Sequence, residues 1–146
     1  MATPEELQGL TDAFRRCVGW GASPERLGVN RGAFGFLPAL SELDDVHAAA
    51  AGTVIRAAID QALGQLSGTY ELFGRTYAAG TIRAAIRLEL AFDHPDWSAH
   101  RRRSQVITLL GTHHMPGYWA RPEGPEWELL QLFAEHLVDV QKAKRL

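Results

Sequence analysis

The sequence predicts an all-α fold, a compact bundle of five or six helices in a single domain spanning residues 1–146. Three observations predict it. Apolar residues recur at the three- and four-residue spacing of a helix face along most of the chain. The segments with this spacing begin at capping residues and end at glycine or proline. A long alternation of apolar and polar residues, the pattern of a half-buried strand, is absent from the sequence.

The first helix has the clearest start signal. Thr3, Pro4 and Glu6 form the pattern of a capping box with a proline in the first turn. One apolar face follows, made of Leu7, Leu10, Phe14, Cys17 and Val18. Gly19 and Gly21 are expected to end this helix. A short helical turn then restarts at Ser23 by the same capping logic, before a glycine-rich loop.

The middle of the chain is expected to hold two further helices with a short piece between them. A long helix is predicted from near Ser41 or Asp44, either of which can cap it, to Leu66. Residues 70–77 form a short amphipathic piece interrupted by glycine. Residues 81–92 return to helical spacing, so they predict the next helix.

The C-terminal half has the outline of a helix-turn-helix. A helix is predicted to end at Leu110 and to be capped by Asp96 or Ser98, and the last helix begins at Pro125. Between them lies a segment rich in turn residues, 112–125. A helix, a turn and a further polar segment are the parts of a helix-turn-helix, although the prolines and glycines of this segment work against a second helix.

Composition excludes a disordered tail, since 46% of the residues are apolar and 15 basic side chains nearly balance 17 acidic ones. The single cysteine, Cys17, cannot form an internal disulfide. The sequence shows no secretory signal and no run of about 18 apolar residues. We therefore expect a cytoplasmic protein that makes no membrane contact and needs no cofactor.

Residues 98–122 are the local electrostatic anomaly, because they contain basic side chains and histidines but no acid. Four of them are candidate phosphate contacts of a DNA-binding regulator: Arg101, Arg102, Arg103 and Arg121. Consecutive helical positions lie about 100° apart, so the three adjacent arginines cannot all face one groove.

The second half of the chain also resembles a known helical module. The pattern is an apolar helix, an arginine run, a Leu-Gly turn and a Leu-Leu helix. It is carried by Leu88-Glu89-Leu90-Ala91-Phe92, Arg101-Arg102-Arg103, Leu109-Leu110-Gly111, Glu128-Leu129-Leu130, Phe133-Ala134 and Leu137. Over residues 70–138 this resembles a helical module of actinobacterial regulatory and conflict-system proteins. The resemblance implies a scaffold or sensing domain of a regulatory system.

Histidines supply the candidate metal ligands. His94, His113 and His114 offer nitrogen ligands for zinc or iron if the fold gathers them. Neither a His-x-x-x-His nor a Glu-x-x-His pair occurs in the sequence, so spacing lends little support. Cys17 lies on an apolar helix face, where we expect a small buried hydrophobe and not a nucleophile. A small helical enzyme with a histidine-lined pocket is one alternative.

Large aromatic residues in or beside loops are candidate anchors for a protein partner. Phe36, Tyr118 and Trp119 lie in loop-like surroundings and are the predicted partner-binding residues. We therefore expect a non-catalytic regulatory or protein-interaction module that binds a protein partner or a second copy of itself. A nucleic-acid partner, bound through Arg101 to Arg103, is the other alternative.

Overall fold

The computed structural model describes residues 2–37, 40–41, 43 and 46–143, and this part of the chain is mostly helical. Its elements are α1 (Pro4–Trp20), α2 (Pro24–Val29), the 3-10 helix η1 (Arg31–Phe34), α3 (Ala48–Gly64), β1 (Thr69–Leu72), β2 (Arg75–Ala78), α4 (Ala79–Glu89), α5 (Ala99–Leu110), α6 (Pro116–Trp119) and α7 (Pro125–Ala143). The predicted all-α class is confirmed. The seven α-helices of the described residues exceed the predicted five or six, because α6 forms inside the expected turn segment. None of the described helices is long and apolar enough to cross a membrane.

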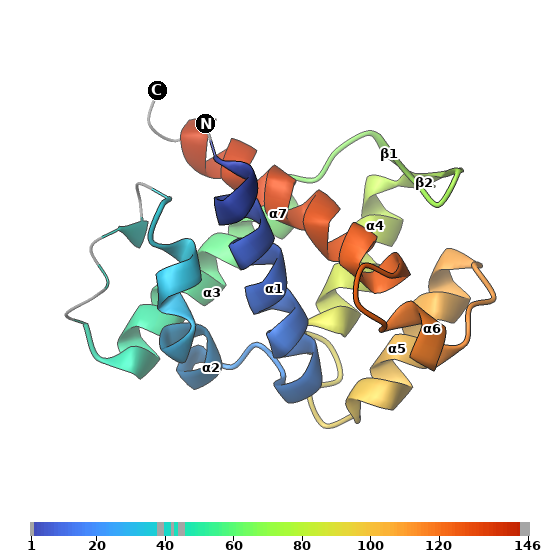
Figure 1. The fold of residues 1–146 in the computed structure, drawn as a ribbon, viewed down its shortest axis with the longest axis horizontal. Helices are drawn as coiled ribbons and strands as arrows, with labels where there is room; N and C mark the ends of the chain where they lie inside the picture. Colours follow the sequence, from blue (N-terminus) through green and yellow to red (C-terminus); the bar gives the residue numbers. More distant parts are fainter. Residues whose placement is uncertain (1, 38–39, 42, 44–45, 144–146) are drawn as a thin grey trace.

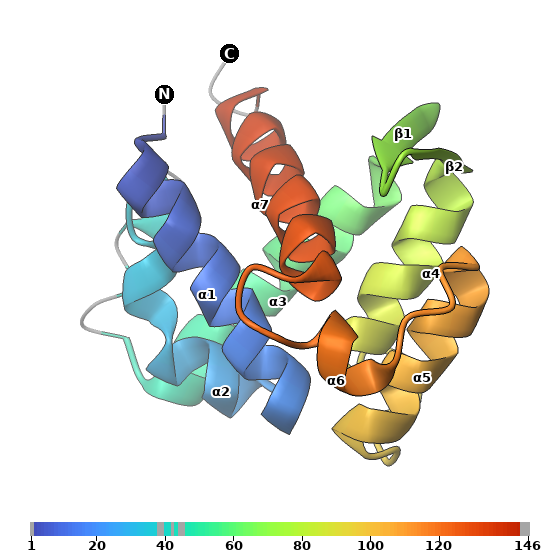
Figure 2. The same ribbon diagram turned by 45° about the vertical axis from the view of Figure 1, so that its right-hand side comes forward.

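The long helix α7 lies at the centre of the arrangement (Figure 1). It packs against α1, α3 and α4, while α2 packs across α3. Seen from the second direction, α5 covers α4 and the short α6 lies between α5 and the start of α7 (Figure 2). The C-terminal half of α1 and the α5–α6 pair therefore border the same region of the molecule.

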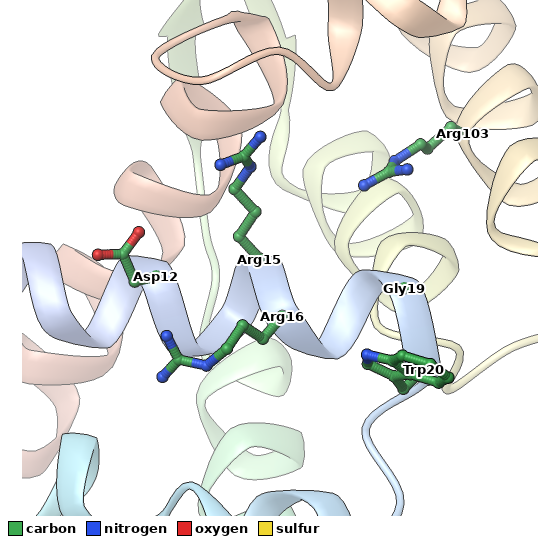
Figure 3. Close-up of a pocket in the computed structure, with 6 residues that line it drawn as sticks. All are labelled: Asp12, Arg15, Arg16, Gly19, Trp20 and Arg103. Carbon is green, nitrogen blue, oxygen red and sulfur yellow. The ribbon is translucent and has the colours of Figure 1, made fainter.

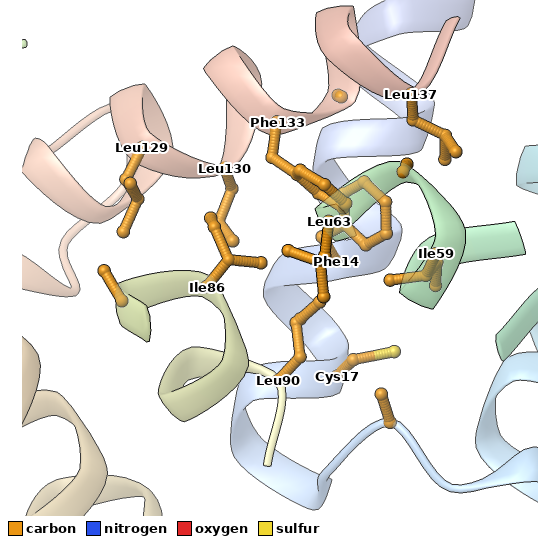
Figure 4. Packing of buried hydrophobic residues seen from close by; sticks show 14 of the residues in the cluster. Phe14, Cys17, Ile59, Leu63, Ile86, Leu90, Leu129, Leu130, Phe133 and Leu137 are labelled. Atoms are coloured by element: carbon orange, nitrogen blue, oxygen red, sulfur yellow. The ribbon is translucent and has the colours of Figure 1, made fainter. Parts of the chain in front are cut away.

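The hydrophobic core fills the space between α1, α3, α4 and α7 (Figure 4). Phe14 lies against Phe34 and Phe133, with ring centroids 5.8 and 5.4 Å apart. Cys17 is buried in this core, as predicted. Burial raises the pKa of its thiol to about 11, so the group stays protonated at neutral pH and acts as a packing atom.

Local capping explains where three of the helices begin. In α1 the backbone N–H of Glu6 donates to Thr3 Oγ1 at 3.1 Å, and the N–H of Thr3 donates to Glu6 Oε1 at 2.9 Å. Ser23 caps α2 and Ser98 caps α5 through their hydroxyl oxygens. These three predicted starts are confirmed, since each depends on residues only three positions apart.

The predicted start of the long middle helix is wrong. Helix α3 begins at Ala48, and the imidazole Nδ1 of His47 caps it by accepting the N–H of Ala49 at 3.3 Å. Ser41 lies in a turn before it. Asp44, the other predicted cap, lies outside the described residues.

Residues 70–77 form a β-hairpin in place of the short amphipathic piece that the sequence predicted. β1 and β2 pair antiparallel, with Tyr70 opposite Tyr77. Phe73 and Gly74 connect them with φ angles of 56° and 71°, the left-handed conformation that a two-residue type I′ turn requires. The strain at Phe73 is offset by its ring, which packs on Trp119 at a centroid distance of 5.7 Å.

Two glycines allow the backbones of α2 and α3 to touch. A side chain at Gly28 would collide with the carbonyl oxygen of Ala48, and one at Gly52 with the carbonyl oxygen of Pro24.

We expect Gly52→Ala to lower the free energy of unfolding by about 2 kcal/mol, because the helices would have to separate. Urea denaturation would measure this. Gly9→Ala in α1, where an added Cβ meets no atom within 4 Å, should instead be neutral or stabilising.

Candidate functional site

One face of α1 carries its polar and exposed residues. Asp12, Arg15, Arg16, Gly19 and Trp20 are spaced as i, i+3, i+4, i+7 and i+8, which places them on one side of the helix. The opposite side of α1 is buried in the core. This polar side borders the start of α5, whose Arg103 approaches it (Figure 3).

These five residues and Arg103 line an open cleft of about 310 Å³, which we call the arginine cleft. The side chains of Arg15 and Arg103 extend from α1 and α5 into the same gap (Figure 3). On this face of α1, Gly19 lies between Arg15 and Trp20, and it contributes no side chain. The cleft is therefore open at its middle and charged at its edge.

Each arginine of the cleft is held by one partner. Arg15 Nη2 donates to the carbonyl oxygen of Ala120 at 2.7 Å, which joins α1 to the end of α6. Arg16 Nε donates to Asn30 Oδ1 at 3.0 Å. Among the described residues, the remaining guanidinium nitrogens of both arginines have no hydrogen-bond partner, so they can bind a ligand.

The cleft is positive and aromatic in a chain whose net charge is −2. Its lining carries three arginines against one acidic residue, Asp12. Trp20 is 71% exposed, and the guanidinium of Arg26 lies over its ring at 4.6 Å. Guanidinium groups beside an exposed aromatic ring are suited to an anion that carries an apolar or aromatic part.

Arg103 connects the cleft to a buried polar cluster formed by α4, α6 and α7. Its Nε and Nη2 donate to Glu126 Oε2 and Oε1 at 2.7 and 3.0 Å, a bidentate ion pair. Nearby, Trp119 Nε1 donates to Glu89 Oε1 at 2.8 Å. Glu89, Glu126 and Trp119 are all fully buried. The two carboxyl groups therefore stabilise the packing of these helices and do not reach a ligand in the cleft.

The carboxyl group of Glu89 is held in its neutral form. Burial raises its pKa well above the ordinary value, and the adjacent carboxylate of Glu126 raises it further. Glu89 Oε2 has no hydrogen-bond partner among the described residues.

The four predicted phosphate contacts have different environments. Arg101 is exposed and stacks on Trp97 at 4.0 Å, and Arg121 stacks on Tyr118 at 4.1 Å. The prediction for Arg102 is wrong, because its side chain is 2% exposed and donates to four main-chain carbonyls. Arg103 lines the arginine cleft, and two of its guanidinium nitrogens donate hydrogen bonds to Glu126.

The helix-turn-helix outline does not form a recognition helix. Helix α6, which follows the turn after α5, has only four residues, Pro116–Trp119. It ends at Ala120, and Gly124 separates it from α7. A single helical turn is too short to present successive side chains to a major groove.

The predicted partner-binding aromatics are only partly exposed. Tyr118 is 46% exposed, and Phe36 is half-buried against the core. The prediction for Trp119 is wrong, because its indole is fully buried and fixed by Glu89. Trp20 is more exposed than any of these three.

The predicted histidine metal site is wrong for the described residues, which contain no group of three potential ligands. His94 stacks on Trp97 at 3.8 Å. His114 instead packs against the ring of Tyr118 at 5.1 Å. His113 is exposed in a left-handed backbone conformation. The histidine-lined pocket of the enzyme alternative is therefore not formed by these residues.

Sequence reasoning missed Arg15, Arg16 and the role of Trp20. The available signal was the i, i+3, i+4, i+7, i+8 spacing of polar residues opposite the apolar face of the first helix. A polar helix face is ordinarily solvated surface, so the spacing alone does not mark a site. The approach of Arg103 from α5, 83 or more positions along the chain from this face, could not be read from local sequence.

Comparison with known proteins gives no match to a protein-family model, to a curated protein or to a solved structure. The function is therefore inferred from the geometry of the arginine cleft.

Proposed function

We propose that this chain is a non-catalytic binding module of a regulatory system and that it docks an anionic partner in the arginine cleft. The observation that carries the proposal is that three arginines and an exposed indole line one open cleft. Positive charge and arginine-aromatic surfaces are characteristic of binding sites on otherwise acidic proteins.

The non-catalytic part of the proposal follows from the chemistry of the lining. The carboxyl groups of Glu89, whose pKa is raised, and of Glu126 are buried and do not line the cleft. The thiol of Cys17 is buried and protonated. The regulatory part is supported by the resemblance over residues 70–138, and a cytoplasmic location by the single cysteine.

A protein partner or a second copy of the chain is the occupant predicted from sequence, and nucleic acid is the second candidate. Exposed arginines outside the cleft favour nucleic acid, since Arg101 and Arg121 would extend a positive surface beyond it. The two candidates differ in which arginines matter.

Charge reversal in the cleft tests the proposal. We expect the full chain to bind a labelled poly-glutamate peptide more weakly at about 200 mM than at about 50 mM salt, because the contact is electrostatic. The double variant Arg15→Glu, Arg16→Glu should lose this binding. Fluorescence anisotropy would measure it, with circular dichroism to show that the variant is folded.

Arg121→Glu is the matched control, because Arg121 is exposed and does not line the cleft. It should bind the peptide as the unmodified chain does. Binding that survives reversal of Arg15 and Arg16 would overturn the proposal. A labelled mixed-sequence duplex bound through Arg101 and Arg121, with no peptide binding, would establish the nucleic-acid candidate instead.

A further inference from the structure

We infer that the arginine cleft binds a nucleoside phosphate, with the phosphate between Arg15 and Arg103 and the base against Trp20. This inference rests on the proposed function and specifies its ligand. It is drawn from three features of the cleft: the unused donors of its arginines, the exposed indole at its edge and its size.

Arg15 and Arg103 provide donors for a phosphate from two different helices. Arg15 uses Nη2 to hold Ala120, and Arg103 uses Nε and Nη2 to hold Glu126. Arg15 Nη1 and Nε and Arg103 Nη1 have no partner among the described residues. Both side chains are thus already fixed by packing contacts and extend into one gap (Figure 3), which lowers the entropy cost of binding.

Trp20 supplies a stacking surface for a base. Its indole is exposed and lines the cleft, and Arg26, which does not line the cleft, lies over its ring at 4.6 Å. Arg26 covers one face of the ring, so a base would stack on the opposite face. Stacking on an indole suits any base, because every base has an aromatic face, so this contact selects nucleotides as a class.

The dimensions of the cleft favour a nucleotide over an acidic protein segment. A volume of about 310 Å³ lies at the small end of the range for small-molecule pockets. The six residues that line the cleft are far fewer than the roughly 20–30 residues that a stable protein interface needs on each side. The middle of the cleft is open because an added Cβ at Gly19 would meet no atom within 4 Å. Asp12 adds an acceptor that suits a sugar hydroxyl or a base amine and repels a second carboxylate.

Nuclear magnetic resonance on the 15N-labelled full chain tests the inference through the four tryptophan indole signals, assigned with Trp→Phe variants. The probes are ATP, inorganic pyrophosphate, adenosine and a short single-stranded oligo-adenylate. We expect ATP to shift the Trp20 signal and to bind about tenfold more tightly than pyrophosphate, because only ATP adds a stacked base. Trp20→Leu should weaken ATP binding about tenfold and leave pyrophosphate binding unchanged.

A steric block gives a second test that changes no charge. Gly19→Leu places a side chain in the middle of the cleft and should abolish the ATP-dependent shift. Gly9→Leu is its matched control, since Gly9 lies in the same helix, has equal space around it and does not line the cleft. Both variants should retain the helical circular dichroism of the unmodified chain.

The outcomes separate this inference from the proposed function. If poly-glutamate and pyrophosphate bind through Arg15 but ATP binds no more tightly than pyrophosphate, the nucleotide inference is wrong and the binding module stands. If no anion binds in the cleft, both are wrong. If oligo-adenylate binds more tightly than ATP, the ligand is single-stranded nucleic acid. If ATP binds more tightly than oligo-adenylate, the ligand is a free nucleotide.

Discussion

Replacing Arg102 with methionine is expected to lower the free energy of unfolding by about 3–5 kcal/mol, a large part of the stability of a domain of this size. The guanidinium donates to the carbonyl oxygens of Trp97, Leu88, Glu89 and Val18 at 3.3, 3.3, 2.7 and 2.7 Å. Methionine has similar length and no donor. The variant therefore removes the donor from the carbonyl oxygens of Val18 and Glu89, whereas that of Leu88 still accepts the N–H of Ala91.

The position of these carbonyls explains why a charge is buried there. Val18 lies in the last turn of α1, and Leu88 and Glu89 end α4. The last carbonyls of a helix have no partner within it, and they form the negative end of the helix dipole. Arg102, in the first turns of α5, thus fixes the ends of two helices to the start of a third. Burial lowers the pKa of its guanidinium, but an arginine side chain stays charged in proteins.

Arg101→Met is the matched control for this prediction, because Arg101 is the adjacent residue, is exposed and stacks on Trp97. It should cost about 0.5 kcal/mol. Urea denaturation followed by circular dichroism would compare the two. Equal losses from both variants would contradict the role of Arg102 as an internal clamp.

The sequence predicted helix boundaries well where the signal is local. The caps at Thr3, Ser23 and Ser98 act on backbone groups three residues away, so they can be predicted from the local sequence alone. His47 caps α3 although histidine is not a preferred cap, which is why the predicted start falls too early. Ser41 and Asp44 lie nearby and are preferred capping residues, so the prediction placed the start of the helix at one of them.

The hairpin was missed because its turn depends on packing far along the chain. A two-residue hairpin turn ordinarily shows Asn-Gly or Asp-Gly, and here Phe73 takes the first position. The left-handed backbone of Phe73 is tolerated because its ring contacts His114 and Trp119. That contact joins segments about forty residues apart and leaves no local mark in the sequence.

The arginine run shows how far a charge pattern can be interpreted. The 100° rotation between helical positions correctly predicted that Arg101, Arg102 and Arg103 face different ways. It could not show that one would be exposed, one buried and one paired with Glu126. Those outcomes depend on α1, α4 and α7, which pack around α5 only in the folded chain. The arginine cleft itself arises from the same long-range packing.

The carboxyl group of Glu89 is expected to make stability depend on pH in a way that Glu89→Gln removes. Its pKa in the folded chain is raised well above the ordinary value by burial and by Glu126. Its stabilising contribution is therefore complete below the ordinary glutamate pKa and is lost as pH rises through the raised one. Glutamine cannot ionise, yet it keeps an oxygen for the indole N–H of Trp119 and has an amide N–H donor in place of the carboxyl O–H.

We therefore expect the unmodified chain and Glu89→Gln to have similar stability near pH 4.5. Above it, the variant should become more stable relative to the unmodified chain by up to about 1.4 kcal/mol per pH unit, until the folded-state pKa of Glu89 is passed. Glu89→Ala should cost about 3 kcal/mol at pH 5, because it leaves the buried indole N–H of Trp119 unpaired and opens a cavity. Urea denaturation of the three chains across this pH range measures both effects. Parallel curves for Glu89→Gln and the unmodified chain would contradict this prediction. They would show that Glu89 ionises in the folded chain at its ordinary pKa, because a carboxyl group with a raised pKa must lower the free energy of unfolding as pH rises.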